Sequence, residues 1–282
     1  MPELPEVEVT RRSLALQLPG ASIISVQLGK PLRWPLGCAP EALVGLRVAS
    51  IDRRGKYLLL RLDNARPVGS GGDEAGYLMV HLGMSGSLLL DAAPPTPEAH
   101  DHFVMQTSHG ALRLRDPRRF GAVMFVDGLT SPWATKLLGR LGAEPLSDAF
   151  EVGPFVAAVR RSRLAIKQLL LGGQVVVGVG NIYASEVLFQ SGIHPARPAK
   201  ELTDASLTRL HAAIREVLAR AVGRGGTTLR DFASADGQMG HFQSDVTVYG
   251  REGLPCVVCG HTIRKIVQGQ RSTYFCAVCQ PI

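Results

Sequence analysis

The sequence has no long hydrophobic run and neither of the two common glycine-rich phosphate-binding motifs. No apolar stretch approaches the ~20 residues that a helix needs to span a bilayer, and the first residues lack the basic and apolar regions of a signal peptide. The glycines match neither the G-x-x-x-x-G-K-[ST] loop nor the G-x-G-x-x-G fingerprint. We therefore expect a cytoplasmic protein with no membrane partner and no small-molecule cofactor.

Lysine is also scarce, although the protein is basic. Only 6 of the 31 lysines and arginines are lysine, and the formal net charge is +7. Arginine can bind phosphate through two parallel hydrogen bonds, and a basic surface attracts polyanions. Residues 159–167 hold four cations and no acid, and residues 111–119 hold four cations and one acid. We therefore predict nucleic acid as the partner; a charge that serves only solubility is the alternative.

Cysteine is almost absent until the end of the chain, where four of the five cysteines lie. Cys256, Cys259, Cys276 and Cys279 form two C-x-x-C pairs, a spacing typical of a four-thiolate zinc site. Two disulfides are the alternative, which a reducing cytoplasm disfavours. Because the protein supplies all four ligands, the zinc would be structural. We expect Cys38, which stands alone, to be a small buried apolar residue.

The hydrophobic pattern changes from strands to helices near residue 130. Short apolar segments predict strands at 23–26, 48–51, 57–60, 77–80, 88–90 and 112–115, and this spacing suggests a sandwich or a barrel. The last segment alternates with period two, so we expect one exposed, basic face. Helical spacing predicts helices over 5–18, 154–171, 181–191 and 204–222, the last with Thr203 as its N-cap.

The first eight residues, MPELPEVE, combine two prolines with three carboxylates. Removal of Met1 would leave Pro2 with a free secondary amine of pKa about 8, partly unprotonated at neutral pH. Such an amine can attack a carbonyl carbon and form an iminium, and Glu3 beside it is a candidate general acid or base. The alternative is that the glutamates only open a helix, where they suit its dipole.

Further candidates lie at the ends of strands and in short loops. Lys56 is a candidate acid or phosphate ligand, or else an exposed strand-end cation. Met84, with glycines nearby, and the pair Arg118 and Phe120 form two loop tips suited to a DNA groove and to wedging into a base step. Burial of Met84 and Phe120 in the core is the alternative. Residues 176–183 lead into a helix N-terminus that suits a phosphate.

In this order, the motifs resemble those of the bacterial formamidopyrimidine-DNA glycosylase family. The similarity covers the whole chain and rests on PELPEVE (2–8), RGKYLL (54–59), HLGMSGS (81–87), DPRRFG (116–121), VGVGNIYASE (177–186), GGTTL (225–229) and the four cysteines. It implies an α+β fold: an N-terminal two-sheet β-sandwich with a flanking N-terminal helix, a helical domain with a helix–two-turns–helix motif, and a zinc finger β-hairpin. We expect a sandwich over residues 1–130, a linker region over 131–153, the helical DNA-binding domain over 154–245 and the zinc finger over 246–282.

The resemblance also implies a reaction. A member of this family removes oxidised purines, chiefly 8-oxoguanine and formamidopyrimidines, from double-stranded DNA through a Schiff base and then cleaves the strand by β- and δ-elimination. The implied catalytic residues are Pro2, Glu3, Lys56 and Arg271, and the implied DNA-binding residues are His100, Arg118, Arg161, Lys167, Asn181, Met84, Phe120 and Tyr249. One structural zinc on the four cysteines, a monomer, and a place on the bacterial nucleoid are further expectations.

Other functions stay open from the sequence. A relative of the endonuclease VIII type, which removes oxidised pyrimidines, shares the architecture, but Leu4 and the intact Arg118-Arg119-Phe120 argue against it. A non-catalytic zinc-containing DNA-binding protein would bind without cutting, and an N-terminal-proline tautomerase would leave the zinc pattern unexplained. The chain departs from the family's usual pattern in the arginines of 160–163 and in a longer 64–76 loop, and residues 234–243 resemble the loop that caps the flipped base.

Overall fold

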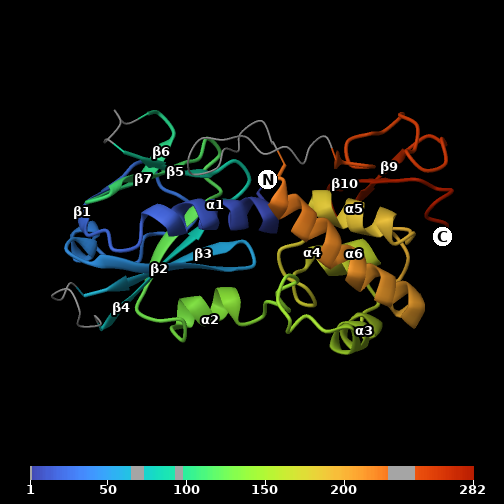
Figure 1. The fold of residues 1–282 in the computed structure, drawn as a ribbon, viewed down its shortest axis with the longest axis horizontal. Helices are drawn as coiled ribbons and strands as arrows, with labels where there is room; N and C mark the ends of the chain where they lie inside the picture. Colours follow the sequence, from blue (N-terminus) through green and yellow to red (C-terminus); the bar gives the residue numbers. More distant parts are fainter. Residues whose placement is uncertain (1, 65–72, 93–97, 228–244) are drawn as a thin grey trace. The chain divides into compact units, whose positions relative to one another are not determined.

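The computed structural model describes residues 2–64, 73–92, 98–227 and 245–282 (Figure 1). The described residues form two compact units, residues 2–140 with 225–227 and residues 141–224 with 245–282. The expected base-capping loop at 234–243 and most of the 64–76 loop lie outside the described residues.

Helix α1 (Leu4–Gln17) begins the first unit. Its N-cap is Glu3, which forms a capping box with Glu6, so two backbone N–H groups that a helix start leaves without partners are satisfied. Its apolar face is buried as predicted, with exposures of 1% or less at Val7, Leu14 and Leu18. The predicted helix over 5–18 is confirmed to within one residue at each end.

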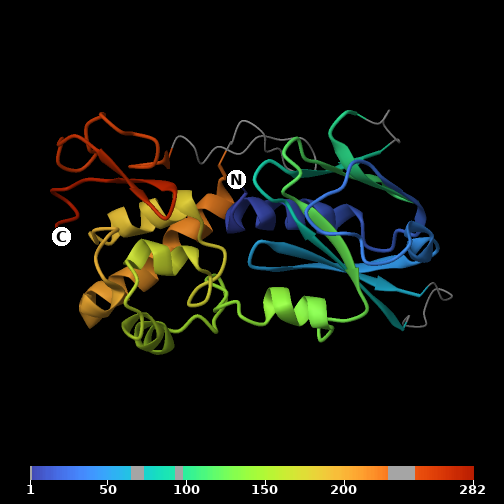
Figure 2. The same ribbon diagram turned by 180° about the vertical axis from the view of Figure 1, so that it is seen from behind.

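Two four-stranded antiparallel sheets make up most of this unit (Figure 2). One has the order β1-β6-β7-β5 and the other the order β2-β3-β4-β8. The strands are β1 (Ile23–Leu28), β2 (Arg47–Arg54), β3 (Tyr57–Asp63), β4 (Glu74–His81), β5 (Ser87–Asp91), β6 (Asp101–Thr107), β7 (Gly110–Arg115) and β8 (Ala122–Val126), with a short 3-10 helix at Pro40–Leu43. All six predicted strands are present.

The strands β6 and β8 were not predicted. β6 begins with Asp101 and His102, two polar residues that the fold buries and whose sequence does not signal a strand. β8 is a five-residue apolar run, and such a run is equally compatible with a segment of buried helix.

The two sheets share one hydrophobic core, so they form the predicted sandwich. All eight strands and α1 contribute buried side chains to this core. In β3, Leu58, Leu60 and Leu62 belong to it, whereas Leu59 lies on the opposite face of the sheet and packs toward helix α2 (Pro132–Leu138). This sheet is therefore covered on both faces, which explains the continuous apolar run of β3.

The predicted exposed basic face of 112–115 is wrong. Arg113 on β7 is only 6% exposed. Its guanidinium pairs with Asp101 at 3.0 Å, with Asp91 at 3.2 Å and with Glu98 at 3.3 Å. The neighbouring strands β5 and β6 supply two of these acids, and a buried charge requires such partners.

The second unit is helical. It contains α3 (Val152–Arg160), α4 (Ile166–Leu171), α5 (Asn181–Gln190) and α6 (Asp204–Gly223), a 3-10 helix at Ala199–Glu201, and a hairpin of β9 (Arg264–Gln268) and β10 (Arg271–Phe275). Thr203 caps α6 as predicted by accepting a hydrogen bond from the Ser206 N–H. Helices α4 and α5, joined by residues 172–180, form the expected helix–two-turns–helix motif. No helix in the described part of the chain is both long and apolar enough to cross a membrane.

The predicted helix over 154–171 is two helices. Residues 161–165 interrupt it, because the Ser162 hydroxyl accepts the Leu164 N–H and the Ile166 N–H donates to the Arg197 carbonyl rather than along the helix. Arg160, at the end of α3, pairs with Asp204 at 2.8 Å. The basic run at 159–167 therefore does have an acidic partner in space.

We predict that Gly29→Ala destabilises the sandwich by about 2 kcal/mol. The Gly29 N–H donates to His102 O, and an added Cβ would lie 2.3 Å from the Asp101 carbonyl oxygen. Urea unfolding measures the effect. In the control Gly153→Ala, the new Cβ would meet no atom of the described chain within 4 Å, so its midpoint should be unchanged or slightly higher. Equal midpoints for the two variants would refute the close contact at Gly29.

Candidate active site and metal centre

The N-terminal residues are buried at the start of α1. Pro2 is buried, and Glu3 is 1% exposed. The Glu3 N–H donates to Glu6 Oε2 at 2.8 Å, while Glu6 Oε1 accepts from both the N–H (2.8 Å) and the hydroxyl (2.9 Å) of Thr227. One buried carboxylate thus fixes the backbone beside Pro2 and a second segment that is 221 residues away in sequence.

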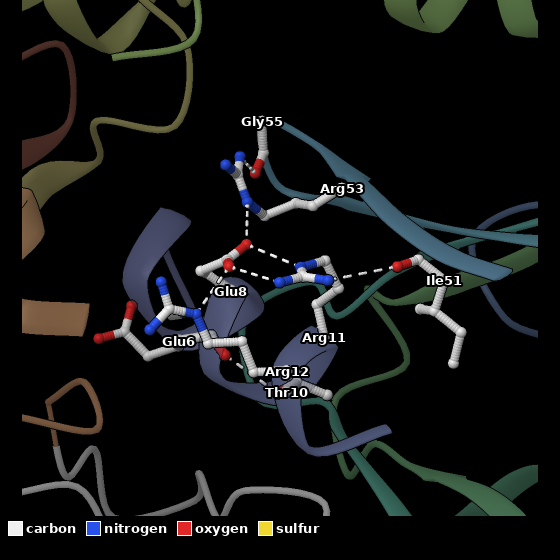
Figure 3. Close-up of polar contacts among 8 residues, drawn as sticks. All are labelled: Glu6, Glu8, Thr10, Arg11, Arg12, Ile51, Arg53 and Gly55. Carbon is white, nitrogen blue, oxygen red and sulfur yellow. Dashed lines mark hydrogen bonds and ion pairs between the residues drawn. The ribbon is translucent and has the colours of Figure 1, made fainter. Parts of the chain in front are cut away.

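A second carboxylate of α1, that of Glu8, is held by three arginines (Figure 3). It accepts from Arg11 Nη2 and Arg12 Nε at 2.9 Å each and from Arg53 Nε at 2.9 Å. Burial alone raises the pKa of Glu8, but the hydrogen bonds from the three arginines outweigh it and lower the pKa to about 2. Glu8 is therefore ionised throughout the neutral range.

Lys56 lies in the turn between β2 and β3, and its positive charge acts on His81 of β4. Tyr57 pairs with His81 in the sheet, and their rings are 4.9 Å apart. Burial lowers the pKa of His81 to about 4, and the charges of Lys56 and Arg33 contribute. His81 Nδ1 accepts the Gly83 N–H at 3.0 Å, so the neutral ring carries its proton on Nε2 and can donate there.

Sequence reasoning missed His81 as a candidate. The only signal in the sequence was its position at the start of the HLGMSGS motif. Its neutral state depends on burial and on two cations from other segments, which the sequence does not display.

The two predicted loop tips lie against each other. The Ser85 hydroxyl donates to Asp116 Oδ1 at 2.6 Å, and the Gly121 N–H donates to Asp116 Oδ2 at 2.7 Å. Gly83 has a φ of +65° and approaches the second tip so closely that an added Cβ would lie 2.4 Å from its backbone. Glycine is therefore required at this contact.

The side chains at these tips point outward. Met84 is 40% exposed and Phe120 is 45% exposed, which excludes their burial in the core. The Arg118 guanidinium lies 5.1 Å from the centre of the Phe120 ring. Exposed apolar side chains on a rigid double turn are available for contact with a partner.

His100 is linked to the same double turn. It is exposed, it directly precedes β6, and its carbonyl accepts the Asp116 N–H at 2.9 Å. It therefore lies near the Arg118 tip, whereas the nearby His102 is buried and its Nδ1 finds no partner among the described residues.

In the second unit, two predicted residues converge on β10. Lys167 is fully buried, and its Nζ donates to the Thr273 hydroxyl at 2.8 Å and to the Ser272 carbonyl at 3.2 Å. Asn181, the first residue of α5, donates to the same Ser272 carbonyl at 3.0 Å. Both residues therefore fix the strand immediately after Arg271, which is exposed beside the β9–β10 turn.

Two more predicted residues lie elsewhere in this unit. Arg161 is the exposed C-cap of α3. Tyr249 is half-buried, its ring is 5.1 Å from that of Tyr274, and its N–H donates to Glu186 at 2.8 Å. Glu186 also accepts the N–H groups of Thr247 and Val248, so a carboxylate of α5 orders the approach to Tyr249. No motif in the sequence indicates this role of Glu186 separately.

The four predicted metal ligands come together. The sulfurs of Cys256, Cys259, Cys276 and Cys279 lie within 4.8 Å of one another, with 3.4 Å between Cys259 and Cys276 and 3.9 Å between Cys256 and Cys279. Thiolates bound to a tetrahedral zinc ion are about 3.8 Å apart, whereas bonded disulfide sulfurs are about 2.05 Å apart. The set fits one zinc ion. When bound, zinc would cross-link the thiolates and leave no coordination position for a substrate.

We predict that Cys256→Ser abolishes zinc binding. Because a unit of this size depends on its metal, the β9–β10 hairpin should lose its order as well. Zinc content per chain and amide hydrogen exchange over 264–275 measure the two effects. The control Cys38→Ser should keep both at the wild-type level. Retention of zinc by Cys256→Ser would contradict the four-thiolate site.

We predict that Glu8→Gln lowers the stability at neutral pH by about 3 kcal/mol, because hydrogen bonds from Arg11, Arg53 and Arg12 lower the native pKa of Glu8 to about 2. A depressed pKa contributes stability above the unfolded value, near pH 4.5, and this contribution is lost as the pH falls toward 2. The difference between wild type and variant in urea unfolding should therefore shrink between pH 5 and pH 2. A pH-independent difference would refute this account. Exposed Glu41→Gln serves as the control and should change little.

Comparison with known proteins gives the same result for all three parts of the chain. The family model of the formamidopyrimidine-DNA glycosylase N-terminal domain matches residues 1–123, that of the formamidopyrimidine-DNA glycosylase H2TH domain matches residues 141–233, and that of a zinc finger found in FPG and IleRS matches residues 253–282. The formamidopyrimidine-DNA glycosylase of Variovorax paradoxus is 58% identical over 280 residues, covering 99% of this chain and all of the relative.

Solved structures agree in fold. The MutM (FPG) protein of Thermus thermophilus has a TM-score of 0.87 at 40% identity and covers 99% of this chain and 98% of its own. A Lactococcus lactis FPG mutant in complex with DNA that contains Fapy-dG has a TM-score of 0.89 at 35% identity, with both chains fully covered. The predicted α+β fold class is confirmed, and the chain belongs to the formamidopyrimidine-DNA glycosylase family.

Proposed function

We propose that this chain is a DNA glycosylase and abasic-site lyase of base excision repair, which removes oxidised purines from double-stranded DNA. The observation that carries the proposal is the buried Pro2–Glu3 start of α1, held by Glu6 in a chain of this family. Relatives support the substrate class: one solved complex contains Fapy-dG DNA and another, of MutM, contains carbocyclic 8-oxo-G DNA.

The reaction begins at the amine of Pro2 once Met1 is removed. The damaged nucleotide leaves the base stack, at a cost of a few kcal/mol. The Pro2 nitrogen then bonds to the sugar C1′, the C1′–base bond breaks, and the base leaves with the proton that the Pro2 N–H gives up. Glu3 donates a proton to the ring oxygen, which opens the sugar and leaves an iminium between Pro2 and C1′.

The iminium acidifies the hydrogens at C2′. Loss of one of them expels the 3′-phosphate by β-elimination, and a second elimination expels the 5′-phosphate. We assign Lys56 to the first elimination, as proton donor or phosphate ligand, and Arg271 to the second. Lys167 and Asn181 bind the strand that carries Arg271, and we infer that they position it as well as lie near the phosphates.

The proposed DNA contacts use the exposed side chains already described. Met84, Arg118 and Phe120 would fill the space left by the flipped nucleotide and contact the opposite base. His100, Arg161 and Tyr249 would bind near the backbone. The domain boundaries stated from the sequence and a monomeric state belong to this proposal.

Oxidised pyrimidines are a second candidate substrate class. One observation favours them: a structural relative, the Lactococcus lactis FPG, is found in complex with DNA that contains an oxidised pyrimidine. This would bring the chain closer to the endonuclease VIII type of specificity.

We predict that borohydride traps a covalent adduct between the wild-type protein and an 8-oxoguanine duplex, and that Pro2→Gly loses at least about a hundredfold of this product. Reduction of the iminium makes the adduct permanent, and peptide mass analysis should locate it on Pro2. A non-catalytic DNA-binding protein would give no adduct with wild-type protein. Faster trapping on thymine glycol than on 8-oxoguanine opposite cytosine would reverse the substrate assignment.

A further inference from the structure

Glu8 binds more guanidinium groups than are needed to neutralise its charge. Arg11 and Arg12 belong to α1 and by themselves more than neutralise its charge. A third arginine, Arg53, comes from the end of β2 and donates from Nε to Glu8 Oε2 at 2.9 Å (Figure 3). Glu8 therefore connects α1, which begins beside Pro2 and Glu3, to a strand that lies 45 residues away in sequence.

Arg53 carries this connection to the turn that contains Lys56. Its Nη1 donates to the Gly55 carbonyl at 3.0 Å, and this carbonyl belongs to the peptide bond between Gly55 and Lys56. Arg54 pairs with Tyr57, so Gly55 and Lys56 form the whole two-residue turn, and Gly55 has the positive φ (+59°) that such turns require. A fixed peptide plane at this place fixes the direction in which the Lys56 side chain leaves the backbone.

We propose that Glu8 and Arg53 are positioning residues. They hold the turn that carries Lys56 at a fixed position relative to the Pro2–Glu3 start of α1. The inference rests on the proposed function, in which Pro2 forms the iminium and Lys56 serves the first elimination. Glu8 and Glu3 lie within two turns of one helix, whose rise is about 1.5 Å per residue. The Glu8 carboxylate therefore links the position of Lys56 to the position of Pro2 and Glu3.

The burial of the pair distinguishes it from a surface ion pair. The side chains of Glu8 and Arg53 are each 10% exposed, whereas that of Arg12 is 58% exposed. Exposed pairs contribute little to stability or geometry. Arg12 binds the same carboxylate but does not join α1 to β2 in the contacts described, so it provides a matched control.

The test separates the charge of Arg53 from its bridging geometry. Arg53→Lys keeps the positive charge that neutralises Glu8, but it lacks the planar fork through which Nε reaches Glu8 and Nη1 reaches the Gly55 carbonyl. Two single-turnover rates are measured for wild type, Arg53→Lys and Arg12→Ala: adduct formation on an 8-oxoguanine duplex, and strand scission of a duplex with a preformed abasic site. Melting temperatures are recorded in parallel.

We expect Arg53→Lys to have the melting temperature of the wild type and a rate of adduct formation within about twofold of the wild-type rate. Its rate of strand scission should be about tenfold lower than that of the wild type. Arg12→Ala should match wild type in both rates. Normal scission by Arg53→Lys would overturn the inference, and so would equal slowing of both steps together with a lowered melting temperature. If wild-type protein forms no adduct, the proposed function fails with it; if wild type is active and Arg53→Lys is normal, only the positioning role fails.

Discussion

In each of the two units, the candidate functional residues depend on buried carboxylates that bind several donors at once. Glu6, Glu8, Asp116 and Glu186 are at most 7% exposed, and each accepts hydrogen bonds from two or more residues. A buried carboxylate is costly unless such donors surround it, so the donors cannot leave without a large penalty. Each of these acids thereby fixes a segment that carries a candidate functional residue.

Each of the four carboxylates binds a different segment. Glu6 fixes the backbone at Glu3 and at Thr227, and Asp116 joins the tips that carry Met84 and Phe120. Glu186 orders residues 247–249, and Glu8 acts on arginines rather than on backbone N–H groups. Candidate functional residues such as Glu3, Lys56 and Tyr249 therefore lie at the end of a helix or in connecting segments, and carboxylates of α1 and α5 bind the backbone or the side chains beside them.

Much of this could be predicted from the sequence where local patterns decide. The C-x-x-C pairs predicted the thiolate cluster, Thr203 predicted the start of α6, and the leucines of α1 predicted its buried face. The sequence failed where a distant segment decides. Arg113 alternates with apolar neighbours like an exposed residue, but acids from β5 and β6 allow its burial. Ser162 and Arg197 end α3 and begin α4 through bonds that no helical pattern displays, and Lys167, which charge alone would place at the surface, is buried against β10.

The predominance of arginine among the basic residues also explains how a protein with a net charge of +7 can use buried carboxylates beside its candidate functional residues. An unpaired acid on a DNA-binding surface would repel phosphate. At Glu8 the single negative charge is surrounded by three guanidinium groups, so the cluster as a whole stays positive while the carboxylate supplies geometry. Arginine suits this arrangement better than lysine, because its planar fork lets Arg53 reach Glu8 with one nitrogen and the Gly55 carbonyl with another. The scarcity of lysine is therefore consistent with a structural demand for bridging cations as well as with binding to phosphate.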